Sequence, residues 1–337
     1  MESEMFRRFA ARLCTAVIIG VVIFFPAMRS EAAAQSAENY PNKPIRFIDA
    51  FAAGGGTDIM ARQIGQKLTE RLKQSVIVDN RPGAGGTIGA EIAAKAAPDG
   101  HTLFMAAVPS LAPSASLYPQ LPYNVMKDFA FVTLLASGTY VVIVNPALPA
   151  KSISELVALA KSRPGKLGYG STGVGGPAHL VGELLKSRAG VDILHVAYKG
   201  SPPIFAAIAS DEVQISYLNI AAVLPLIKAG RLRGLAITAA KRVKAAPELP
   251  TVAESGLPGF DVTPWYGVLT TAATPASIVT LLNREINRVV QLPDMQTVFA
   301  LQGLEVSIGT PEQFRQLMQA EIEKWAKIIK DAGIKVE

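Results

Sequence analysis

The amino-acid sequence predicts an α/β protein made of two units, each a parallel β-sheet covered by α-helices. Short apolar segments alternate with longer segments of helical periodicity, which is typical of this fold class. The alternation stops near the middle of the chain and then starts again. The length of 337 residues suits two domains, because one hydrophobic core seldom grows beyond about 250–300 residues. With 50% hydrophobic and 18% charged residues, the chain is not a disordered protein.

The first unit begins with a strand predicted over residues 45–51. A glycine-rich turn follows, and then a helix whose apolar residues extend over 59–72 at near-helical spacing. A strand over 75–78, a helix over 87–97 and a strand over 102–108 complete the unit. Strand, glycine turn, helix and strand in this order predict a parallel sheet with crossover helices.

The second unit repeats the pattern. Ser152 and Glu155 fit a capping box, so a helix is predicted to begin there and to end before Pro164. Another helix is predicted over residues 177–188, directly behind a glycine-rich loop. The strands, which we expect to form a second parallel set, are predicted at residues 140–144, 167–169, 193–197, 214–218 and 232–238.

Two helices near the C-terminus are predicted to begin at Thr274-Pro275 and Thr310-Pro311, each with an N-cap residue followed by proline. The last helix carries an apolar stripe that we expect in the core, namely Phe314, Leu317, Met318, Ile322, Trp325, Ile328 and Ile329. If this return packs on the first unit, the chain crosses between the units twice, near residues 134–139 and 259–265.

The two crossings give the predicted domain organisation. One domain comprises residues 40–138 and 263–337, and the other comprises residues 139–262. Two connections between domains allow them to close about a hinge around a cleft.

Residues 1–34 have the pattern of a secretory signal peptide, with three arginines before an apolar stretch and small residues at its end. The apolar stretch, 13–28, contains Pro26 and is shorter than the ~20 residues that a bilayer span requires. We therefore expect export to the periplasm and cleavage near Ala34, rather than an uncleaved anchor helix or the twin-arginine route. The single cysteine, Cys14, lies inside this peptide, so the mature protein has no disulfide and no thiol site.

Charge and histidine content exclude several function classes. Lys plus Arg number 33 and Asp plus Glu 27, a net charge of +6 without a run of five basic residues, so no nucleic acid partner is expected. The three histidines, His101, His179 and His195, lack the spacing of a metal site. No phosphate-loop motif is present, and Ser171 has Tyr169 where a nucleophile elbow needs glycine.

Glycine-rich turns at residues 54–56, 83–86 and 170–176 each follow a predicted strand and precede a predicted helix. A helix N-terminus exposes unpaired N–H groups with a partial positive charge, and glycine allows a ligand to approach that backbone closely. Each turn alone is also consistent with a tight connection. Together the three turns predict a binding site for a small anion, which the modest positive net charge also favours.

The third turn also matches a dinucleotide-binding fingerprint. Gly168, Gly170 and Gly173 fit G-x-G-x-x-G, and Asp192 follows about 20 residues later. An exported oxidoreductase with a nicotinamide cofactor is therefore the alternative function. The short strand, and export to a compartment where such cofactors are scarce, favour a protein without a cofactor and without enzymatic activity.

Several polar and aromatic positions have two interpretations each. His179 lies at the start of a helix behind the third turn, where its ring can donate to an anion or bond within the fold. Asn219 follows an apolar strand, and its amide can contact a ligand or cap a helix. Trp265 and Tyr266 fall at the second crossing, where an aromatic ring can line the cleft or pack in the hinge.

Several segments share their pattern with one known family. They are residues 40–46, 51–62 (beginning FAAGGGTD), 80–89 (beginning NRPGAGG), 98–103 (PDGHTL), 169–180 (beginning YGSTG), 195–200 and 256–260 (GLPGF). The sequence therefore resembles, over essentially the whole mature chain, the substrate-binding proteins of tripartite tricarboxylate transporters, the Bug (TctC-like) family.

The resemblance implies a two-domain α/β fold like that of periplasmic binding proteins, the type II-like "Venus flytrap". It also implies capture of a small mono-, di- or aromatic carboxylate by domain closure, and delivery to a two-component integral membrane permease. We expect a monomer. A ligand sensor for a signalling system is the alternative role.

In this family the turns that correspond to residues 51–58 and 171–175 hold one ligand carboxylate from opposite domains, partly through ordered waters. The candidate contacts in this chain are Phe51, Ala53, Gly54, Gly55, Thr57, Asp58, Ser110, Ser171, Thr172, Gly173, Val174, His179, Tyr198 and Asn219. We expect Ser171 and Thr172 to donate hydroxyl groups, and Gly54, Gly55, Gly173 and Val174 to donate backbone N–H groups. Thr57 and Asp58 are expected to cap the first helix and hold a water.

The sequence also departs from the family pattern. Asp49 and Ala50 stand where Val-Pro is usual, Ala197 replaces a usual proline, and Gly176 replaces a usual serine. Asn219 occupies a position that is often Asp. Without that carboxylate, the ammonium group of an amino-acid ligand would lack a negative partner, which disfavours an amino acid.

Overall fold

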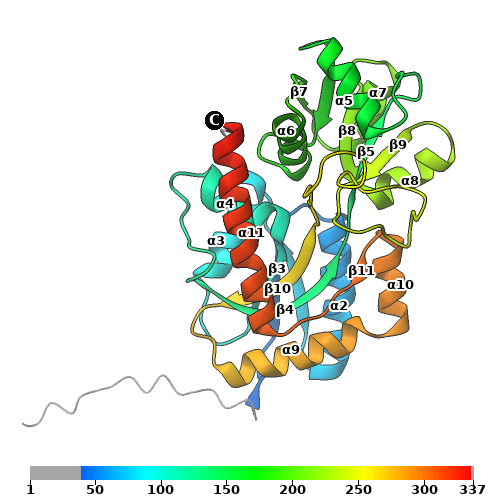
Figure 1. Ribbon diagram of the computed structural model, residues 1–337. Helices are drawn as coiled ribbons and strands as arrows, with labels where there is room; N and C mark the ends of the chain where they lie inside the picture. The colour runs from blue at the N-terminus through cyan, green and yellow to red at the C-terminus, as the bar shows by residue number, and fades with distance from the viewer. Residues whose placement is uncertain (1–38, 335–337) are drawn as a thin grey trace, which may run out of the picture. The chain divides into compact units, whose positions relative to one another are not determined.

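The structure is a computed structural model that describes residues 39–334 (Figure 1). The predicted signal peptide, residues 1–34, and its cleavage site near Ala34 lie outside the described residues. Between residues 39 and 334, no helix combines the length and the apolar character that crossing a membrane requires. The strands of this part form one sheet of six strands and one of five.

The six-stranded sheet has the strand order β11-β4-β10-β3-β1-β2. Its strands are β1 (Ile45–Asp49), β2 (Val76–Asn80), β3 (Thr102–Ala107), β4 (Phe129–Ser137), β10 (Trp265–Thr271) and β11 (Glu305–Val306). As predicted, β1 runs parallel to β2 and β3. The sequence did not predict β4, β10 or β11, and β10 inserts antiparallel between β3 and β4.

The five-stranded sheet has the strand order β7-β6-β8-β5-β9. Its strands are β5 (Tyr140–Val144), β6 (Gly168–Ser171), β7 (Leu194–Ala197), β8 (Ile215–Asn219) and β9 (Arg233–Ile237). β6 is parallel to β7 and β8, but β5 is antiparallel to β8 and β9, so the prediction of a wholly parallel set was wrong. Only Gly138 and Thr139 separate β4 from β5, and without a crossover helix before it β5 enters the sheet in the opposite direction.

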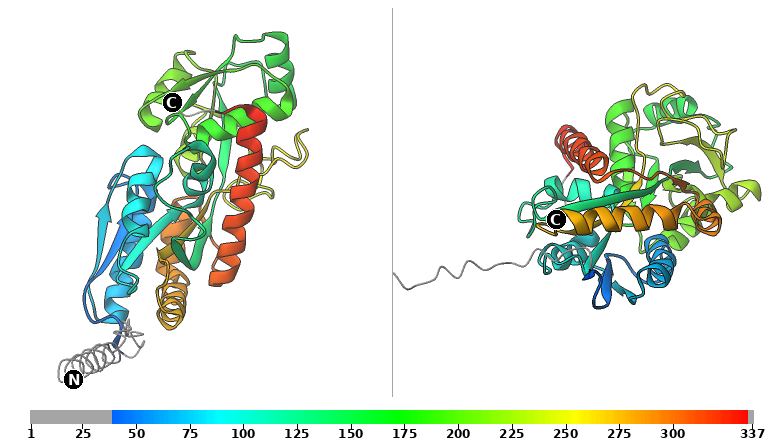
Figure 2. Two further views of the ribbon diagram at one scale, coloured as in Figure 1. Left: turned by 90° about the vertical axis from the view of Figure 1, so that its left-hand side faces the viewer. Right: turned by 90° about the horizontal axis from the view of Figure 1, so that it is seen from below.

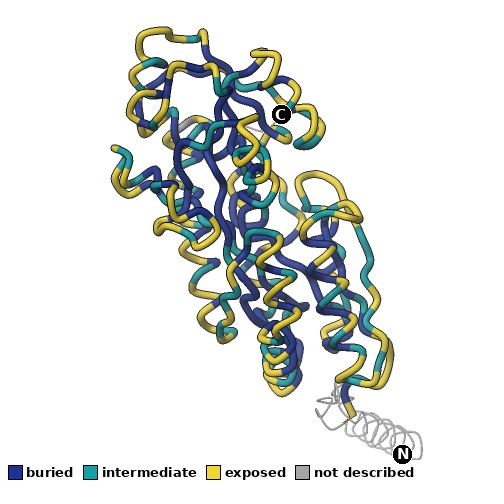
Figure 3. Tube along the Cα trace, turned by 90° about the vertical axis from the view of Figure 1, so that its right-hand side faces the viewer, coloured by how far each residue is buried: buried dark blue, intermediate teal, exposed yellow. Residues whose placement is uncertain are grey.

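Helices cover both faces of each sheet (Figures 1 and 2). On the six-stranded sheet, α2 (Gly56–Leu72), α9 (Ala276–Val290) and α10 (Pro293–Leu301) share one core, and α3 (Thr87–Ala94), α4 (Val108–Leu117) and α11 (Pro311–Ala332) pack on the other face. On the five-stranded sheet, α5 (Ile153–Ser162) and α6 (Pro177–Ala189) lie opposite α7 (Ser201–Ala209) and α8 (Ile220–Lys228). Figure 3 shows that burial is concentrated in the strands and in the sheet-facing sides of the helices.

The chain passes between the two sheets twice, as the sequence predicted. It leaves the first sheet after Ser137, enters the second at Tyr140 and returns to the first at Trp265. The C-terminal return packs on the first sheet, where α11 contacts α4 and β4. The domain bounds, residues 40–138 with 263–337 and residues 139–262, stay a prediction.

The predicted start signals of the helices have mixed outcomes. Thr310 and Gln313 form a complete capping box at α11. At α5, Ser152 accepts from Glu155 N–H, but the Glu155 carboxylate binds Lys151 N–H instead of closing the box. At α9, Pro275 is the N-cap residue, because the Thr274 hydroxyl donates to a preceding carbonyl instead. The apolar stripe of α11 is in the core as predicted, with Phe314, Met318, Trp325 and Ile329 buried.

Candidate functional site

A cavity of about 780 Å³ is lined by residues from elements of both sheets. This volume is typical of sites for small molecules. Its lining comprises Phe51, Gly55, Gly56, Thr57, Ile59, Met60, Ala107, Pro109, Ser110, Tyr140, Thr172, Pro177, Gly200, Ser201, Asn219, Ala221, Ala222, Tyr266, Leu301, Gln302 and Leu304.

Five helices begin at this cavity. α2, α4, α6, α7 and α8 each line it with a residue from the first two helical positions, namely Gly56, Pro109, Pro177, Ser201 and Ala221. In the first four of these helices no side chain of the described residues caps the N-terminus. In α8 the Asn219 side chain accepts from Ala221 N–H at 2.9 Å. The partial positive ends of five helices therefore converge on one space.

The side chains that line the cavity are neutral. Among the described residues of the lining there is no Lys, Arg, His, Asp or Glu. The polar groups are hydroxyls and amides, including those of Thr57, Thr172, Ser201 and Gln302. Burial raises the pKa of the Tyr266 hydroxyl to about 12, so this group is a neutral donor. Helix termini and neutral donors without a competing carboxylate favour a small anion as the occupant.

The N-terminus of α2 keeps the most backbone donors. Its N-cap residue, Gly55, has no side chain, and the first intrahelical hydrogen bond runs from Ile59 N–H to Gly55 C=O. The N–H groups of Gly56 and Thr57 therefore have no intrahelical acceptor. Proline in the first turn of α4, α6 and α7 removes backbone N–H groups there. The first turn of α2 contains no proline and keeps its N–H groups.

Hydrogen bonds to the carboxylate of Asp58 hold the loop before α2 in place. Its carboxylate accepts from Gly54 N–H at 2.8 Å, from Arg62 Nε at 2.9 Å and from Asn80 Nδ2 at 2.9 Å. Burial opposes ionisation of Asp58, but these hydrogen bonds outweigh it and hold its pKa below the ordinary value. The prediction that Thr57 and Asp58 cap α2 was therefore wrong: Gly55 is the N-cap residue, and Asp58 anchors the loop.

The second loop, residues 171–176, is held by two histidines. Ser171 is fully buried, and its Oγ lies 2.6 Å from His195 Nε2 and accepts from Gly173 N–H. His179 Nδ1 accepts from Gly175 N–H at 3.0 Å, and the centroids of the two imidazole rings lie 4.2 Å apart with the ring planes tilted by 32°. Burial, and then the neighbouring His179, lowers the pKa of His195 to about 4, so its ring is neutral at pH 7.

Two of the three glycines of the dinucleotide fingerprint, Gly168 and Gly170, lie against neighbouring side chains, whereas Gly173 has open space beside it. A Cβ on Gly168 would lie 3.3 Å from Val213, and a Cβ on Gly170 would lie 3.1 Å from Ile204 and 3.2 Å from Tyr198. A side chain larger than hydrogen at Gly168 or Gly170 would therefore crowd these neighbours. In residues 39–334, no three His, Cys, Asp or Glu side chains are grouped to hold a metal ion.

Some of the predicted site residues line the cavity, and the others are not part of its lining. Phe51, Gly55, Thr57, Ser110, Thr172 and Asn219 line the cavity. Ser171, His179 and Asp58 are buried and bond within the two loops. Ala53, Gly54, Gly173 and Val174 belong to the same loops but are not part of the lining. The Tyr198 hydroxyl donates to Glu212, so this side chain is engaged elsewhere.

Sequence reasoning missed several lining residues. Gly200 and Ser201 lie between β7 and α7, where the strand–glycine–helix pattern of the loops before α2 and α6 occurs again. The sequence therefore contained a signal for them. Tyr266 lines the cavity, which is one of the two interpretations of this position. Gln302 follows α10 and no motif marks it.

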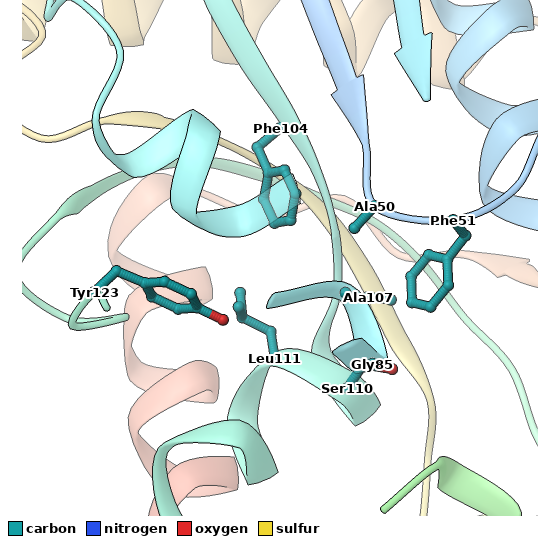
Figure 4. Close-up of a pocket in the computed structure, with 9 residues that line it drawn as sticks. Ala50, Phe51, Gly85, Phe104, Ala107, Ser110, Leu111 and Tyr123 are labelled. Carbon is teal, nitrogen blue, oxygen red and sulfur yellow. The ribbon is translucent and has the colours of Figure 1, made fainter. Parts of the chain in front are cut away.

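A second, much smaller cavity adjoins the first. Phe51, Ala107 and Ser110 line both. Its volume of about 10 Å³ leaves room for about one water molecule. Figure 4 shows the rings of Phe104 and Tyr123 and the side chain of Leu111 around it. The protein is therefore closely packed in this small cavity, and the larger cavity offers the space for a ligand.

Comparisons with known proteins agree with one another. The family model described as the tripartite tricarboxylate transporter family receptor matches residues 60–334. Protein BugT from Bordetella pertussis is 38% identical over 321 residues, which are 95% of this chain and 98% of that protein. A solved R. palustris protein with adipate has a TM-score of 0.78 at 35% identity, covering 88% of this chain and 99% of that one. MatC from Rhodopseudomonas palustris with bound malate has a TM-score of 0.76 at 31% identity, covering 86% and 100%.

Proposed function

Because the chain belongs to the tripartite tricarboxylate transporter family of receptors, we propose that it captures a small organic carboxylate in the 780 Å³ cavity and delivers it to a two-component membrane permease. The receptor would act in the periplasm after removal of its signal peptide. The observation that carries the proposal is the convergence of five helix N-termini on a cavity without charged side chains. Relatives solved with adipate and malate support a carboxylate as the anion.

The ligand carboxylate is proposed to lie at the N-terminus of α2, against the N–H groups of Gly56 and Thr57. Thr172 then donates its hydroxyl from the opposite sheet. A carboxylate that leaves water must regain its hydrogen bonds, since burial of an unpaired charge is costly. Capture with micromolar affinity requires about −8 kcal/mol, and a few charge-assisted hydrogen bonds of about 1.5–3 kcal/mol each supply much of it.

Ala53 and Val174 are proposed to reach the ligand when the two domains close, with Gly54 and Gly173 leaving room for it, since the N–H groups of these two glycines donate to Asp58 and Ser171. A Cβ added to Gly54 or Gly173 would meet no atom within 4 Å, so both loops face open space. Gly54 has a φ of +82° and Gly173 a φ of +136°, conformations that favour glycine. Ligand binding would stabilise the closed state by its higher affinity for that state.

The buried residues Ser171, His179 and Asp58 are proposed to position the two loops rather than to touch the ligand. Ser171 and His195 resemble a nucleophile and its base, because Oγ and Nε2 are only 2.6 Å apart. However, Ser171 is fully buried, so a substrate has no access to its Oγ. This observation, and a family that consists of receptors, favour binding without catalysis.

A thermal-shift screen tests the binding function. The panel contains aliphatic and aromatic mono- and dicarboxylates, including adipate and malate, and the corresponding neutral amides as matched controls. At about 100 times its Kd a ligand stabilises the folded state by about 2.7 kcal/mol, which gives a clear rise in Tm. The proposal expects a rise with at least one acid and none with its amide. Equal shifts with acid and amide, or no shift across the panel, contradict it.

A second experiment tests the transport role. Uptake of the radiolabelled acid that the screen identifies is compared between cells with and without the gene. Loss of uptake supports delivery to a permease, whereas unchanged uptake with loss of a transcriptional response to the acid indicates a sensor.

A further inference from the structure

A buried carboxylate lies directly below the proposed anion site. Asp49 is the last residue of β1 and is fully buried. Its Oδ2 accepts from Thr57 Oγ1 at 3.1 Å and from Asn80 Nδ2 at 3.4 Å. Its Oδ1 is buried and has no hydrogen-bond partner in residues 39–334. Such a group is costly in its ionised form, and buried polar groups without partners are rare.

The charges that face Asp49 from α2 do not neutralise it. Asp58 is negative and repels the Asp49 carboxylate. Arg62 is attracted to Asp49, but its guanidinium bonds to Asp58 and to Asn80 Oδ1, and its side chain is about half exposed.

The neighbouring strands supply no compensating charge either. From β2, Asn80 offers an amide, and Arg81 donates only its backbone N–H to the carbonyl of Asp49. The Arg81 side chain pairs with Asp79 instead. From β3, the partner in register is Met105, which is buried and apolar. Burial is the main cause that raises the pKa of Asp49 to about 6, against the hydrogen bond from Thr57 and the nearby backbone N–H groups of Phe51 and Ala50, which favour the ionised form.

Thr57 connects Asp49 to the cavity. It is the second residue of α2, lines the cavity and has a single hydroxyl hydrogen. When Asp49 is ionised, Thr57 donates this hydrogen to Oδ2, and the hydroxyl then has no hydrogen for a ligand. When Asp49 carries a proton, Asp49 becomes the donor and Thr57 Oγ1 the acceptor. The Thr57 hydrogen is then free to turn into the cavity toward an anion.

From this geometry we propose that Asp49 is a positioning residue, which couples capture of the carboxylate to uptake of one proton through the hydroxyl of Thr57. The inference rests on the proposed function. The proton comes from solvent and stays on Asp49, and no covalent bond of the ligand changes. A bound anion above α2 disfavours ionised Asp49, and by reciprocity protonated Asp49 favours the anion. Affinity therefore increases as the pH falls, by up to about tenfold per pH unit.

Calorimetric titration of the acid found in the screen, with adipate and malate tested in any case, measures this coupling. The titrations run between about pH 6 and pH 8, where a carboxyl group with a pKa of about 4 is fully ionised, and the proton uptake is corrected for the second ionisation of each diacid. Two buffers of different ionisation enthalpy at each pH give the number of protons taken up per ligand. The wild-type protein is expected to take up as much as one proton and to bind more tightly at the lower pH.

Asp49→Asn isolates the residue, because its amide is neutral and donates to Thr57 as protonated Asp49 would. We expect this variant to take up no proton and to keep, at pH 8, the affinity that the wild-type protein has at pH 6. Asp49→Val is the second neutral variant, in case the amide impairs folding. The matched control is Asp79→Asn on the neighbouring strand, which removes a carboxylate paired with Arg46 and is expected to keep the pH dependence.

The outcomes distinguish this inference from the proposed function. A bound acid whose affinity changes equally with pH in the wild-type protein and in both neutral variants overturns the coupling and leaves the receptor function intact. If no acid binds, the receptor function fails and the coupling fails with it.

Discussion

The hydroxyl oxygen of Ser171 lies 2.6 Å from Nε2 of His195, so the second glycine loop is tied to the neighbouring strand β7. The hydroxyl also accepts from Gly173 N–H, which fixes the turn that follows. Because the Ser171 side chain is fully buried, we propose that these bonds take the place of the ligand contact that the motif predicts. The adjacent Thr172 is exposed and lines the cavity instead.

We expect Ser171→Ala to destabilise the protein with and without ligand. The substitution removes a hydrogen-bond partner of His195 and of Gly173 N–H, at a cost of about 1–3 kcal/mol. Thr172→Val is the matched variant: it should leave the unliganded Tm nearly unchanged and reduce the ligand-induced shift. Melting curves with and without the acid check both. If Ser171→Ala has a normal unliganded Tm but no longer shows the ligand-induced rise in Tm, Ser171 contacts the ligand.

The strand–glycine–helix pattern was the strongest signal in the sequence, and it located the loops before α2 and α6 correctly. It is a local pattern, and backbone conformation at a helix N-terminus depends mainly on nearby residues. Which side chain of a loop faces the ligand depends on distant partners. Ser171 turns inward because of His195, which is 24 residues away along the chain.

The elements that the sequence analysis missed have partners far away in the sequence. β10 pairs with β3 and β4, more than a hundred residues earlier, and no local alternation sets this strand apart from the preceding loop. Gln302 reaches the cavity because α10 packs on α2. Contacts of this kind result from the return of the chain to the first sheet, which a search for motifs does not detect.

The two adjacent histidines, His179 and His195, should make the protein less stable in mild acid. Burial is the main cause that lowers the pKa of both His179 and His195, the latter to about 4. Below the ordinary histidine pKa of about 6.5 the unfolded chain binds protons that the folded chain does not. Stability is therefore complete above about pH 6.5 and falls as the pH decreases toward 4. The Tm of the unliganded protein, measured across this range, checks the sign.

His195→Gln is the variant for this prediction. Its amide can still accept from Ser171 and does not titrate in this range, so the loss of Tm between pH 7 and pH 4.5 should be smaller than in the wild-type protein. An identical loss in both proteins would place the acid sensitivity elsewhere in the chain.

Asp49→Asn should stabilise the unliganded protein at neutral pH. Because the pKa of Asp49 is raised to about 6 by burial, its contribution to stability is present at low pH and is lost as the pH rises through 6. A difference of about 2 pKa units corresponds to roughly 2–3 kcal/mol, so the variant should gain about that much at pH 8 and little at pH 4. Urea unfolding at both values measures the gain. A variant less stable than the wild-type protein at pH 8 would contradict a buried charge at this position.

Gln302→Met should weaken binding without destabilising the protein. Gln302 lines the cavity, and its Nε2 is buried without a hydrogen-bond partner among residues 39–334. Its Oε1 lies 3.0 Å from the position of a Cβ on Gly56, so the amide faces the N-terminus of α2. Methionine has a similar length and leaves no unsatisfied donor, so the unliganded Tm should not fall. If the amide donates to the ligand carboxylate, its loss should raise the Kd about tenfold, which corresponds to about 1.4 kcal/mol.

Two further variants decide whether this effect belongs to the amide. Gln302→Glu places a negative charge beside the bound anion, so it should raise the Kd more than Gln302→Met does. Gln291→Met changes the residue that follows α9 in the same way, at an exposed position whose amide donates to the helix, and should leave the Kd unchanged. Calorimetric titration of the three variants gives the order of affinities. Wild-type affinity in Gln302→Met would mean that the carboxylate is held by the helix N-termini and the hydroxyl groups without the amide of Gln302.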